Sequence, residues 1–403
     1  MRRILLPLMA LAIAGALAHA DEPVYRAELI FPLEHWHNHG SCIVEAANGD
    51  LIACWFHGSG ERQSDDVVIN GARKPKGAKE WTKPFVLADS PDLPDTNCCM
   101  IIDPKDRLWL LWPAILANTW ESALMKYKVS SDYLQKDGPP KWDYMDNLLI
   151  KQGDDFPDQV KRKTEEYLGD MKVEGRIKEW VDHNYAQAAD KLTRRLGWFT
   201  RAHPKFLPDG RFMVGLYSDG FSFSLNAYSD DLGQTWKFSE PIVGGGNIQP
   251  SFATKKDGTI VAFMRDNGPP PKRVMVSESK DRGETWSKVE DHPTLENPGA
   301  GLELANIANG DWVCIYNDHP QGRHTLAVSI SEDEGKTWKW TRHLERTEPK
   351  GGSFHYPSIV QGKDGMLHAS YTYSEPDALE GKEGKSIKYA TFNKAWVMEG
   401  DPK

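Results

Sequence analysis

One eight-residue motif, Ser-x-Asp-x-Gly-x-Thr-Trp, recurs along this chain and constrains its fold more than any other feature. It reads SDDLGQTW, SKDRGETW and SEDEGKTW at 229–236, 279–286 and 331–338, so its closing tryptophans are 50 and 52 residues apart. Weaker copies end at Trp81 and Trp142. In such a turn, Ser and Asp bind the backbone, Gly takes a positive φ and Trp covers the hairpin. We therefore expect the aspartates of the motif to stabilise turns rather than act in catalysis, namely Asp231, Asp281 and Asp333.

A period of about 50 residues is typical of a propeller blade, which is a four-stranded antiparallel sheet. Apolar strand-like runs, most of them preceded by an Asn-Gly or Asp-Gly turn, occur at 50–56, 107–112, 211–216, 259–264, 311–316 and 366–371. These six runs predict an all-β fold, a six-bladed β-propeller with Asp-box turns. We expect the last blade to span residues 340–397, and a strand near residues 24–30 to join it and close the ring.

The repeat is interrupted once. Trp142 and Trp236 are 94 residues apart, and the excess fits residues 151–197, where apolar residues follow a helical rather than a strand period. The pattern predicts helices at 158–167 and 176–195. This helical insertion is either a cap on the blade surface or a lid over the central pocket, and the sequence leaves both interpretations open.

The N-terminus resembles an export signal. A basic start, a short apolar run and Ala18-His19-Ala20 predict a signal peptide at residues 1–20, with a membrane anchor as the alternative. The mature propeller would then span residues 21–403 and lie in the periplasm or outside the cell, away from the membrane.

Composition excludes some partners. A net charge of -9 and a pI near 5.8 argue against nucleic acid or an anionic membrane surface, although local arginines can still bind an acidic ligand. The five cysteines lack metal-ligand spacing, and we expect buried thiols rather than a metal site. The chain is expected to need no cofactor.

The Asp boxes, the strand pattern and the blade count together resemble the sialidase (neuraminidase) superfamily. This resemblance implies a pocket in which three arginines hold a carboxylate sugar, a Tyr is the nucleophile, a Glu activates it and an Asp is the acid. On the family pattern Arg265 and Arg323 match two of the arginines, Tyr356 matches the nucleophile and Asp66 or Asp65 matches the acid. Two positions depart from the pattern. The first arginine is absent from His37–Ile43, where Asn38 stands between histidines, and Gln249 stands where the Glu is expected.

Histidines are frequent around these positions. His35, His37 and His39 alternate along one predicted strand and should share a face, and His355 precedes Tyr356. Arg201 and His203 begin the blade that follows the helical insertion. Imidazole suits acid–base work, so we expect His37 or His39 to assist Tyr356 and Asp66 in catalysis. Arg201, Arg265 and Arg323 would bind the substrate carboxylate, with Gln249 and His203 as further substrate-binding residues.

Taken with these residues, the sialidase resemblance implies a carbohydrate-active exo-glycosidase that hydrolyses the bond next to an acidic sugar, either sialic acid or a uronate. Two other functions remain open. A polysaccharide lyase that uses a His or Tyr base would account for the missing Glu, and a glycan-binding propeller without catalysis would account for both departures.

Overall fold

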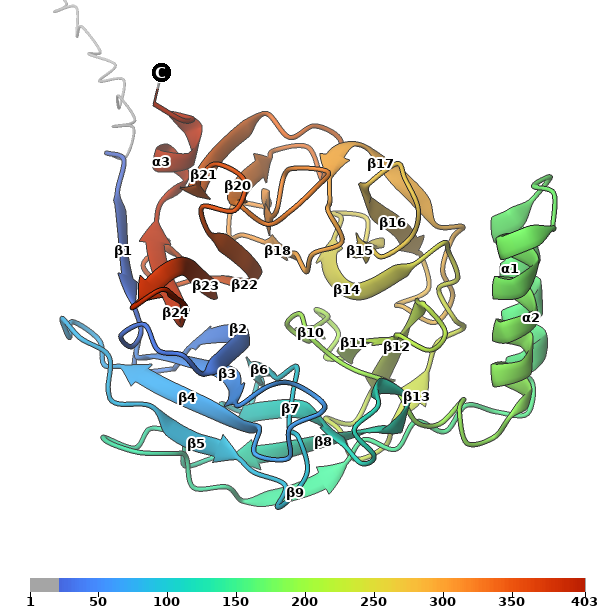
Figure 1. Cartoon of the computed structure of the whole chain (residues 1–403), viewed down its shortest axis with the longest axis horizontal. Helices are drawn as coiled ribbons and strands as arrows, with labels where there is room; N and C mark the ends of the chain where they lie inside the picture. The colour runs from blue at the N-terminus through green and yellow to red at the C-terminus, as the bar shows by residue number, and fades with distance from the viewer. Residues whose placement is uncertain (1–21, 403) are drawn as a thin grey trace, which may run out of the picture.

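Six four-stranded antiparallel sheets stand around a common axis in the computed structural model, which describes residues 22–402 (Figure 1). The predicted all-β, six-bladed propeller is therefore confirmed. The proposed signal peptide at residues 1–20 lies outside the described residues.

The first three blades contain the strands between residues 37 and 238. Blade 1 consists of β2 (His37–Glu45), β3 (Leu51–Gly58), β4 (Val68–Lys74) and β5 (Phe85–Ala88). Blade 2 consists of β6 (Cys99–Ile102), β7 (Leu108–Ile115), β8 (Ala123–Ser130) and β9 (Tyr144–Asn147). Blade 3 consists of β10 (Lys205–Phe206), β11 (Phe212–Ser218), β12 (Phe223–Ser229) and β13 (Lys237–Phe238).

The other three blades complete the ring. Blade 4 consists of β14 (Asn247–Thr254), β15 (Ile260–Asp266), β16 (Arg273–Ser279) and β17 (Glu290–Glu296). Blade 5 consists of β18 (Glu303–Asn306), β19 (Trp312–Tyr316), β20 (Thr325–Ser331) and β21 (Trp340–Arg346). Blade 6 consists of β22 (Ser353–Gln361), β23 (Leu367–Leu379), β24 (Lys382–Phe392) and β1 (Tyr25–Leu29).

The ring closes through its N-terminal strand. β1 pairs with β24 from Tyr25 opposite Phe392 to Leu29 opposite Lys388, so the predicted closing strand is confirmed. The predicted start of the last blade at residue 340 is wrong, because β21 pairs with β20 and belongs to blade 5. The reason is that in blades 1 to 5 the fourth strand follows the Asp-box turn, so each of these blades ends after the tryptophan of its own turn.

The Asp-box side chains hold their turns as expected. Asp231 accepts hydrogen bonds from the Thr235 backbone N–H at 2.8 Å and the Thr235 hydroxyl at 2.6 Å, and Gly233 has a φ of 84°. Asp281 and Asp333 make the same pair of contacts. A Cβ on Gly233 would lie 2.5 Å from the Trp109 ring, so this turn also packs tightly against the neighbouring blade. These aspartates are structural.

We expect Asp231→Ala to lower the free energy of unfolding by about 1 kcal/mol, the usual value of a side chain that caps backbone N–H groups. Hydrogen bonds from Thr235 lower the pKa of Asp231 to about 2. Its contribution is therefore complete above about pH 4, the unfolded-state pKa, and is lost as the pH falls towards 2. Chemical denaturation at pH 7 and pH 2 measures this difference. Asp170→Ala, which changes an exposed aspartate between the two insertion helices, should have little effect at either pH.

Two helices occupy the interruption of the repeat, and they lie at the outside of the ring (green, Figure 1). They are α1 (Phe156–Leu168) and α2 (Gly175–Ala189), and α2 ends before the predicted end at residue 195. Lys163 donates to the Trp286 carbonyl at 2.7 Å, and Gln187 donates to the Gly220 carbonyl at 2.8 Å. The pair therefore packs against blades 3 and 4 as a cap and does not extend over the axis as a lid.

The remaining helices are short. They are η1 (Trp120–Ser122) and α3 (Lys394–Met398). Within residues 22–402, no helix is both long and apolar enough to cross a bilayer. All five cysteines are buried and free, as expected from the apolar runs that contain most of them.

Candidate active site

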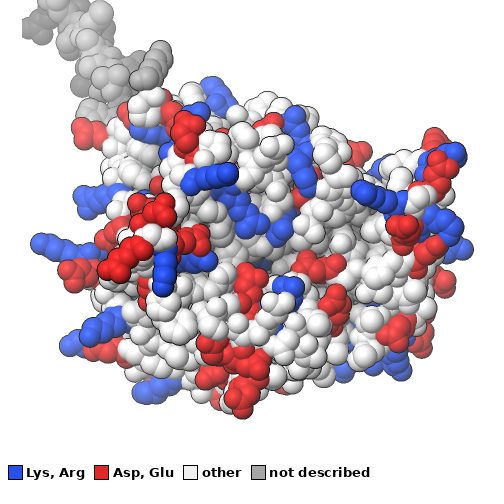
Figure 2. Space-filling model, in the orientation of Figure 1, with Lys and Arg blue, Asp and Glu red and all other residues white. Residues whose placement is uncertain are grey.

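A pocket of about 400 Å³ lies at the axis of the ring, and every blade contributes to it. Basic and acidic side chains both gather around the hollow at the middle of the ring (Figure 2). The pocket is lined by His39, Phe56, Glu61, Asn97, Trp120, Tyr217, Asp219, Gln249, Arg265, Asn267, Arg323 and Tyr356. Residues that are more than 300 positions apart in the sequence therefore share one small volume.

Backbone bulges aim two of these side chains at the axis. The innermost strands β2, β14 and β22 each have a register shift near the end that faces the pocket. At the bulges φ is 64° for Gly40, 58° for Gln249 and 52° for Tyr356. A residue with a side chain is strained in this left-handed region, and such strain is concentrated at functional sites. The fold thus holds Gln249 and Tyr356 in conformations that ordinary strand residues avoid.

The Tyr356 hydroxyl is surrounded by hydrogen-bond donors. Arg265 donates to it through Nη1 at 2.7 Å, and Gln249 donates through Nε2 at 3.1 Å. The Arg323 guanidinium carbon lies 5.4 Å from the centre of the Tyr356 ring. Burial alone would raise the pKa of Tyr356, but the two arginines and the Gln249 amide lower it below its usual range. The surroundings therefore stabilise the phenolate form of Tyr356.

A second tyrosine lies beside the first. Tyr217 Oη accepts hydrogen bonds from Gln249 at 3.2 Å and from Asn97 at 3.1 Å, which leaves its own proton available for donation into the pocket. Burial raises the pKa of Tyr217 well above its ordinary value. Burial also raises the pKa of Asp219, which lines the same side of the pocket. This side therefore favours neutral, proton-donating groups.

A carboxylate–imidazole pair lies at the wall that blade 1 contributes. Glu61 Oε1 is 3.2 Å from His37 Nε2, and the His37 ring centre is 5.5 Å from that of His39. Burial alone would raise the pKa of Glu61, but His37 and the nearby arginines lower it. Glu61 is therefore ionised at neutral pH and can hold His37 in the orientation that a proton donor needs.

The structure brings many of the predicted site residues together. Arg265, Arg323, Gln249, Tyr356 and His39 line the pocket, and His37 adjoins it through Glu61.

Four predicted residues lie elsewhere. Asp66 accepts from the backbone and hydroxyl of Ser59 in an exposed loop, and Asp65 accepts from Asn118. Arg201 and His203 lie beneath the pocket and are bound to other protein groups. Their direct contact with substrate, expected from the sequence, has no support in this geometry.

The structure also shows where residues lie that the sequence did not assign to the site. The Asn38 side chain turns away from the axis, where its Oδ1 accepts from the Trp55 indole at 3.0 Å. Glu61, Asp219, Asn97 and Tyr217 line the pocket although the sequence reasoning did not select them. One signal was available for Glu61, because it lies in the same loop as Asp65 and Asp66. For the others, the sequence carries no local pattern that marks them.

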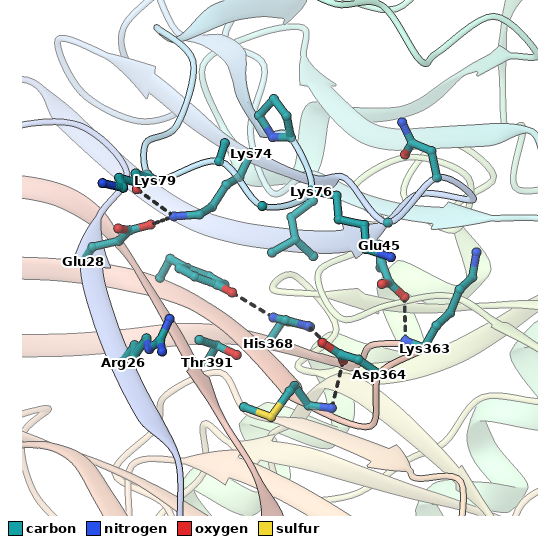
Figure 3. Close-up of a pocket in the computed structure, with 18 of the residues that line it drawn as sticks. Arg26, Glu28, Glu45, Lys74, Lys76, Lys79, Lys363, Asp364, His368 and Thr391 are labelled. Atoms are coloured by element: carbon teal, nitrogen blue, oxygen red, sulfur yellow. Dashed lines mark hydrogen bonds and ion pairs between the residues drawn. The ribbon is translucent and has the colours of Figure 1, made fainter.

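A larger hollow of about 700 Å³ lies between blades 1 and 6, at the opposite end of β2 from the axial pocket (Figure 3). Its acidic and aromatic groups are already bound to neighbours. Glu28 pairs with Lys74, Glu45 accepts from the Lys363 backbone at 2.8 Å, and Tyr389 binds His368 at 2.8 Å. Among the described residues that line this hollow, no tyrosine hydroxyl accepts hydrogen bonds from an arginine and an amide, as that of Tyr356 does. We therefore place the candidate site in the axial pocket. Across residues 22–402, no group of three or more His, Cys, Asp or Glu side chains is arranged to hold a metal ion.

A family model described as a BNR repeat-like domain matches residues 49–157 and 180–369. The chain belongs to this family, within the sialidase superfamily. The unmatched stretch between the two matched parts, residues 158–179, covers most of α1 and the start of α2.

Two curated relatives of this BNR-repeat protein match part of the chain. A sialidase of Micromonospora viridifaciens is 27% identical over 183 residues, which are 43% of this chain and 26% of that protein. An anhydrosialidase of Macrobdella decora is 24% identical over 182 residues, which are 40% of this chain and 23% of that protein. The chain thus spans about a quarter of the length of these relatives.

Solved structures show the same fold. An intramolecular trans-sialidase from Ruminococcus gnavus, in complex with oseltamivir carboxylate, superposes with a TM-score of 0.66 at 13% identity, covering 90% of this chain and 95% of that one. A protein of unknown function from Dyadobacter fermentans has a TM-score of 0.64 at 16% identity, covering 92% of this chain and 99% of that one. At these identities the structural similarity establishes the propeller fold alone. The reaction must be inferred from the residues of the site.

Proposed function

We propose that this protein is a glycosidase that hydrolyses the bond next to a carboxylate-bearing sugar, either sialic acid or a uronate, with Tyr356 as the nucleophile. One observation carries the proposal. The Tyr356 hydroxyl receives hydrogen bonds from Arg265 and Gln249 and lies beside Arg323, all within a pocket at the axis. The sialidase relatives support glycosidase-type activity.

Activation of Tyr356 would not require a carboxylate base. Gln249 has no basic oxygen that can take up the phenol proton, but its N–H group donates to the oxygen and so favours the phenolate. Arg265 acts in the same direction with a full positive charge. A phenolate formed by loss of the phenol proton to solvent can attack the anomeric carbon, break its bond to the leaving-group oxygen and form a glycosyl-enzyme, which water then hydrolyses.

The Glu61–His37 pair is suited to the acid role. A proton donor for the leaving oxygen must act at the pocket wall. Glu61 lines this wall and His37 stands against Glu61, whereas Asp66 binds Ser59 outside the lining, which supports the pair over Asp66. His39 packs against the Tyr356 ring, with ring centres 4.2 Å apart, and would help to orient it. The volume of about 400 Å³ fits a terminal sugar better than the interior of a polymer, which supports exo action.

The test compares paired substrates. Aryl glycosides of N-acetylneuraminic acid and glucuronic acid are each assayed beside the analogue in which the carboxylate is reduced to an alcohol. The wild type should prefer one of the acids strongly, because a charge-assisted contact contributes about 1.5–3 kcal/mol, or roughly 10- to 150-fold. In Arg265→Ala this preference should shrink by about the same factor. The reduced analogue is the matched control, since Arg265→Ala affects the activation of Tyr356 equally for both members of a pair.

Three outcomes would contradict the proposal. Full acid preference in Arg265→Ala would place the carboxylate elsewhere. An unsaturated product that absorbs in the ultraviolet would identify a lyase. Binding of the acidic sugar without any product would identify a glycan-binding protein.

A further inference from the structure

Charged side chains that the proposed reaction does not use lie directly beneath Tyr356. Arg201, His203 and Glu303 come from blades 3 and 5, and none of them lines the axial pocket. Arg201 and Glu303 are 3% and 2% exposed. Burying a charge destabilises the folded protein unless hydrogen-bond or ion-pair partners compensate for it. The groups that this network binds should therefore indicate its function.

The network binds the backbone that follows Tyr356. Arg201 Nη1 donates to the Pro357 carbonyl at 2.9 Å, and its Nη2 donates to the Leu302 carbonyl. Glu303 Oε2 accepts from the Ile359 N–H at 2.9 Å. Between these two contacts, the Ser358 hydroxyl accepts from the Ile43 N–H of blade 1 at 3.1 Å. Each of the three residues after Tyr356 is therefore held by a different blade.

The His203 ring is held as a doubly protonated cation. Its Nδ1 faces Glu303 Oε1 at 2.7 Å, and its Nε2 faces the Ile43 carbonyl at 2.9 Å and the Cys42 sulfur at 3.2 Å. Since both nitrogens face acceptors, both must carry a proton. Glu303 also accepts from the His203 backbone N–H at 2.7 Å, so its two oxygens both act as acceptors and the group is a carboxylate. The result is a buried ion pair that fixes Glu303 under β22.

The same charges approach the reacting groups closely. The Arg201 guanidinium carbon lies 5.8 Å from the Tyr356 ring centre. A Cβ on Gly301 would lie 3.0 Å from both Arg201 Cδ and Gln249 Oε1, so a glycine is needed where the network passes beneath Gln249. Tyr356 has a left-handed backbone, and such a conformation persists only where its surroundings enforce it.

We propose that Arg201 and Glu303 are positioning residues, which hold the β22 bulge so that the Tyr356 hydroxyl meets Arg265 and Gln249. The effects of this positioning on kcat rest on the proposed function, whereas its effect on the titration of Tyr356 does not. Arg201 and His203 would thus serve the site from beneath, through Tyr356, rather than by binding substrate.

Glu303→Gln is the decisive variant, because electrostatics and positioning predict opposite results for it. Loss of a nearby negative charge would by itself make the Tyr356 phenolate form at lower pH. Loss of position separates the phenol from Arg265 and Gln249, so that the phenolate forms at higher pH. Ultraviolet difference titration, with Tyr356→Phe as the baseline, measures the direction. We expect the shift to higher pH.

Kinetics give the second readout. Glu303→Gln and Arg201→Met should each lower kcat by about 100-fold, the effect of displacing a reacting group by roughly 1 Å. KM should change little, because Arg265 and Arg323 remain. Arg201→Lys keeps the charge and one donor, and should recover part of kcat.

Arg211→Met is the matched control. Arg211 is 3% exposed and binds Asp230 and Glu284, so its loss removes an equally buried arginine far from β22. It should lower thermal stability, while the folded enzyme keeps its kcat and its Tyr356 titration.

The proposal is overturned if Glu303→Gln and Arg201→Met behave like Arg211→Met, losing only stability. It is also overturned if the phenolate of Glu303→Gln forms at lower pH. If the wild type hydrolyses no acidic glycoside, the proposed function fails, and the titration still decides the positioning role. If hydrolysis is found but the titration does not move, only the positioning role fails.

Discussion

Replacing Tyr356 with Phe should lower kcat by about 10³-fold or more, the largest effect expected of any substitution in this protein. The change removes the oxygen that Arg265 and Gln249 contact and leaves the ring that packs on His39. Without a nucleophile, the covalent route is closed, and only binding and electrostatic stabilisation remain. Initial rates on the preferred acidic glycoside measure the loss. A fluorinated substrate analogue that slows the second step should add one sugar to the wild type and none to the variant, as read by mass spectrometry.

Tyr217→Phe is the matched control for this substitution. It removes a phenol oxygen that also binds Gln249 and lines the same pocket, but the other donor to that oxygen is Asn97 instead of an arginine. We expect a loss well below that of Tyr356→Phe, with the covalent adduct retained. Adduct formation in Tyr356→Phe would assign the nucleophile to another residue.

The second large effect is expected for Glu61→Gln, which should lower kcat by about 10²- to 10⁴-fold, the usual range for acid–base assistance. Glutamine keeps the size of the side chain but loses the charge that holds His37 at 3.2 Å. The loss should be greatest for natural sugar linkages and small for nitrophenyl glycosides, because a nitrophenolate leaves without a proton. Rates on both types of substrate measure the difference.

Asp66→Asn provides the comparison in the same loop. Asp66 binds Ser59 at the surface and does not line the pocket, so its substitution should leave the rates on both substrates near those of the wild type. A loss in Asp66→Asn with none in Glu61→Gln would return the acid role to the aspartate that the family pattern favours.

The scaffold was predictable because its determinants are local. The Ser, Asp, Gly and Thr of each Asp box contact one another within eight residues, and the turn geometry follows from their side chains alone. The spacing of these turns then predicts the blade count, because each turn joins the last two strands of one sheet. The interruption between Trp142 and Trp236 was visible for the same reason, as a change from strand to helical periodicity within one segment.

The position of the helical insertion was not a local property. The apolar stripe on its helices indicates a buried face, and that face can pack on the outside of a blade or over the axis. Lys163 contacts blade 4 and Gln187 contacts blade 3, so the helices pack on the outside of the ring. The apolar stripe of a helix predicts that one face is buried, but it does not identify the part of the protein against which that face packs.

The sequence by itself determined the Asp-box turns, the six blades and the strand that closes them, because these depend on hydrogen bonds and alternation within short segments. Through the resemblance to the sialidase pattern, it also indicated Arg265, Arg323, Gln249 and Tyr356. Only the tertiary structure decided that Glu61 rather than Asp66 faces the pocket, and that Arg201 and His203 lie beneath it. The reason is physical. At the bulges of β14 and β22 the side chains do not follow the alternation of a regular strand, and their directions depend on contacts with distant blades. Those contacts cannot be predicted from the sequence of a single strand.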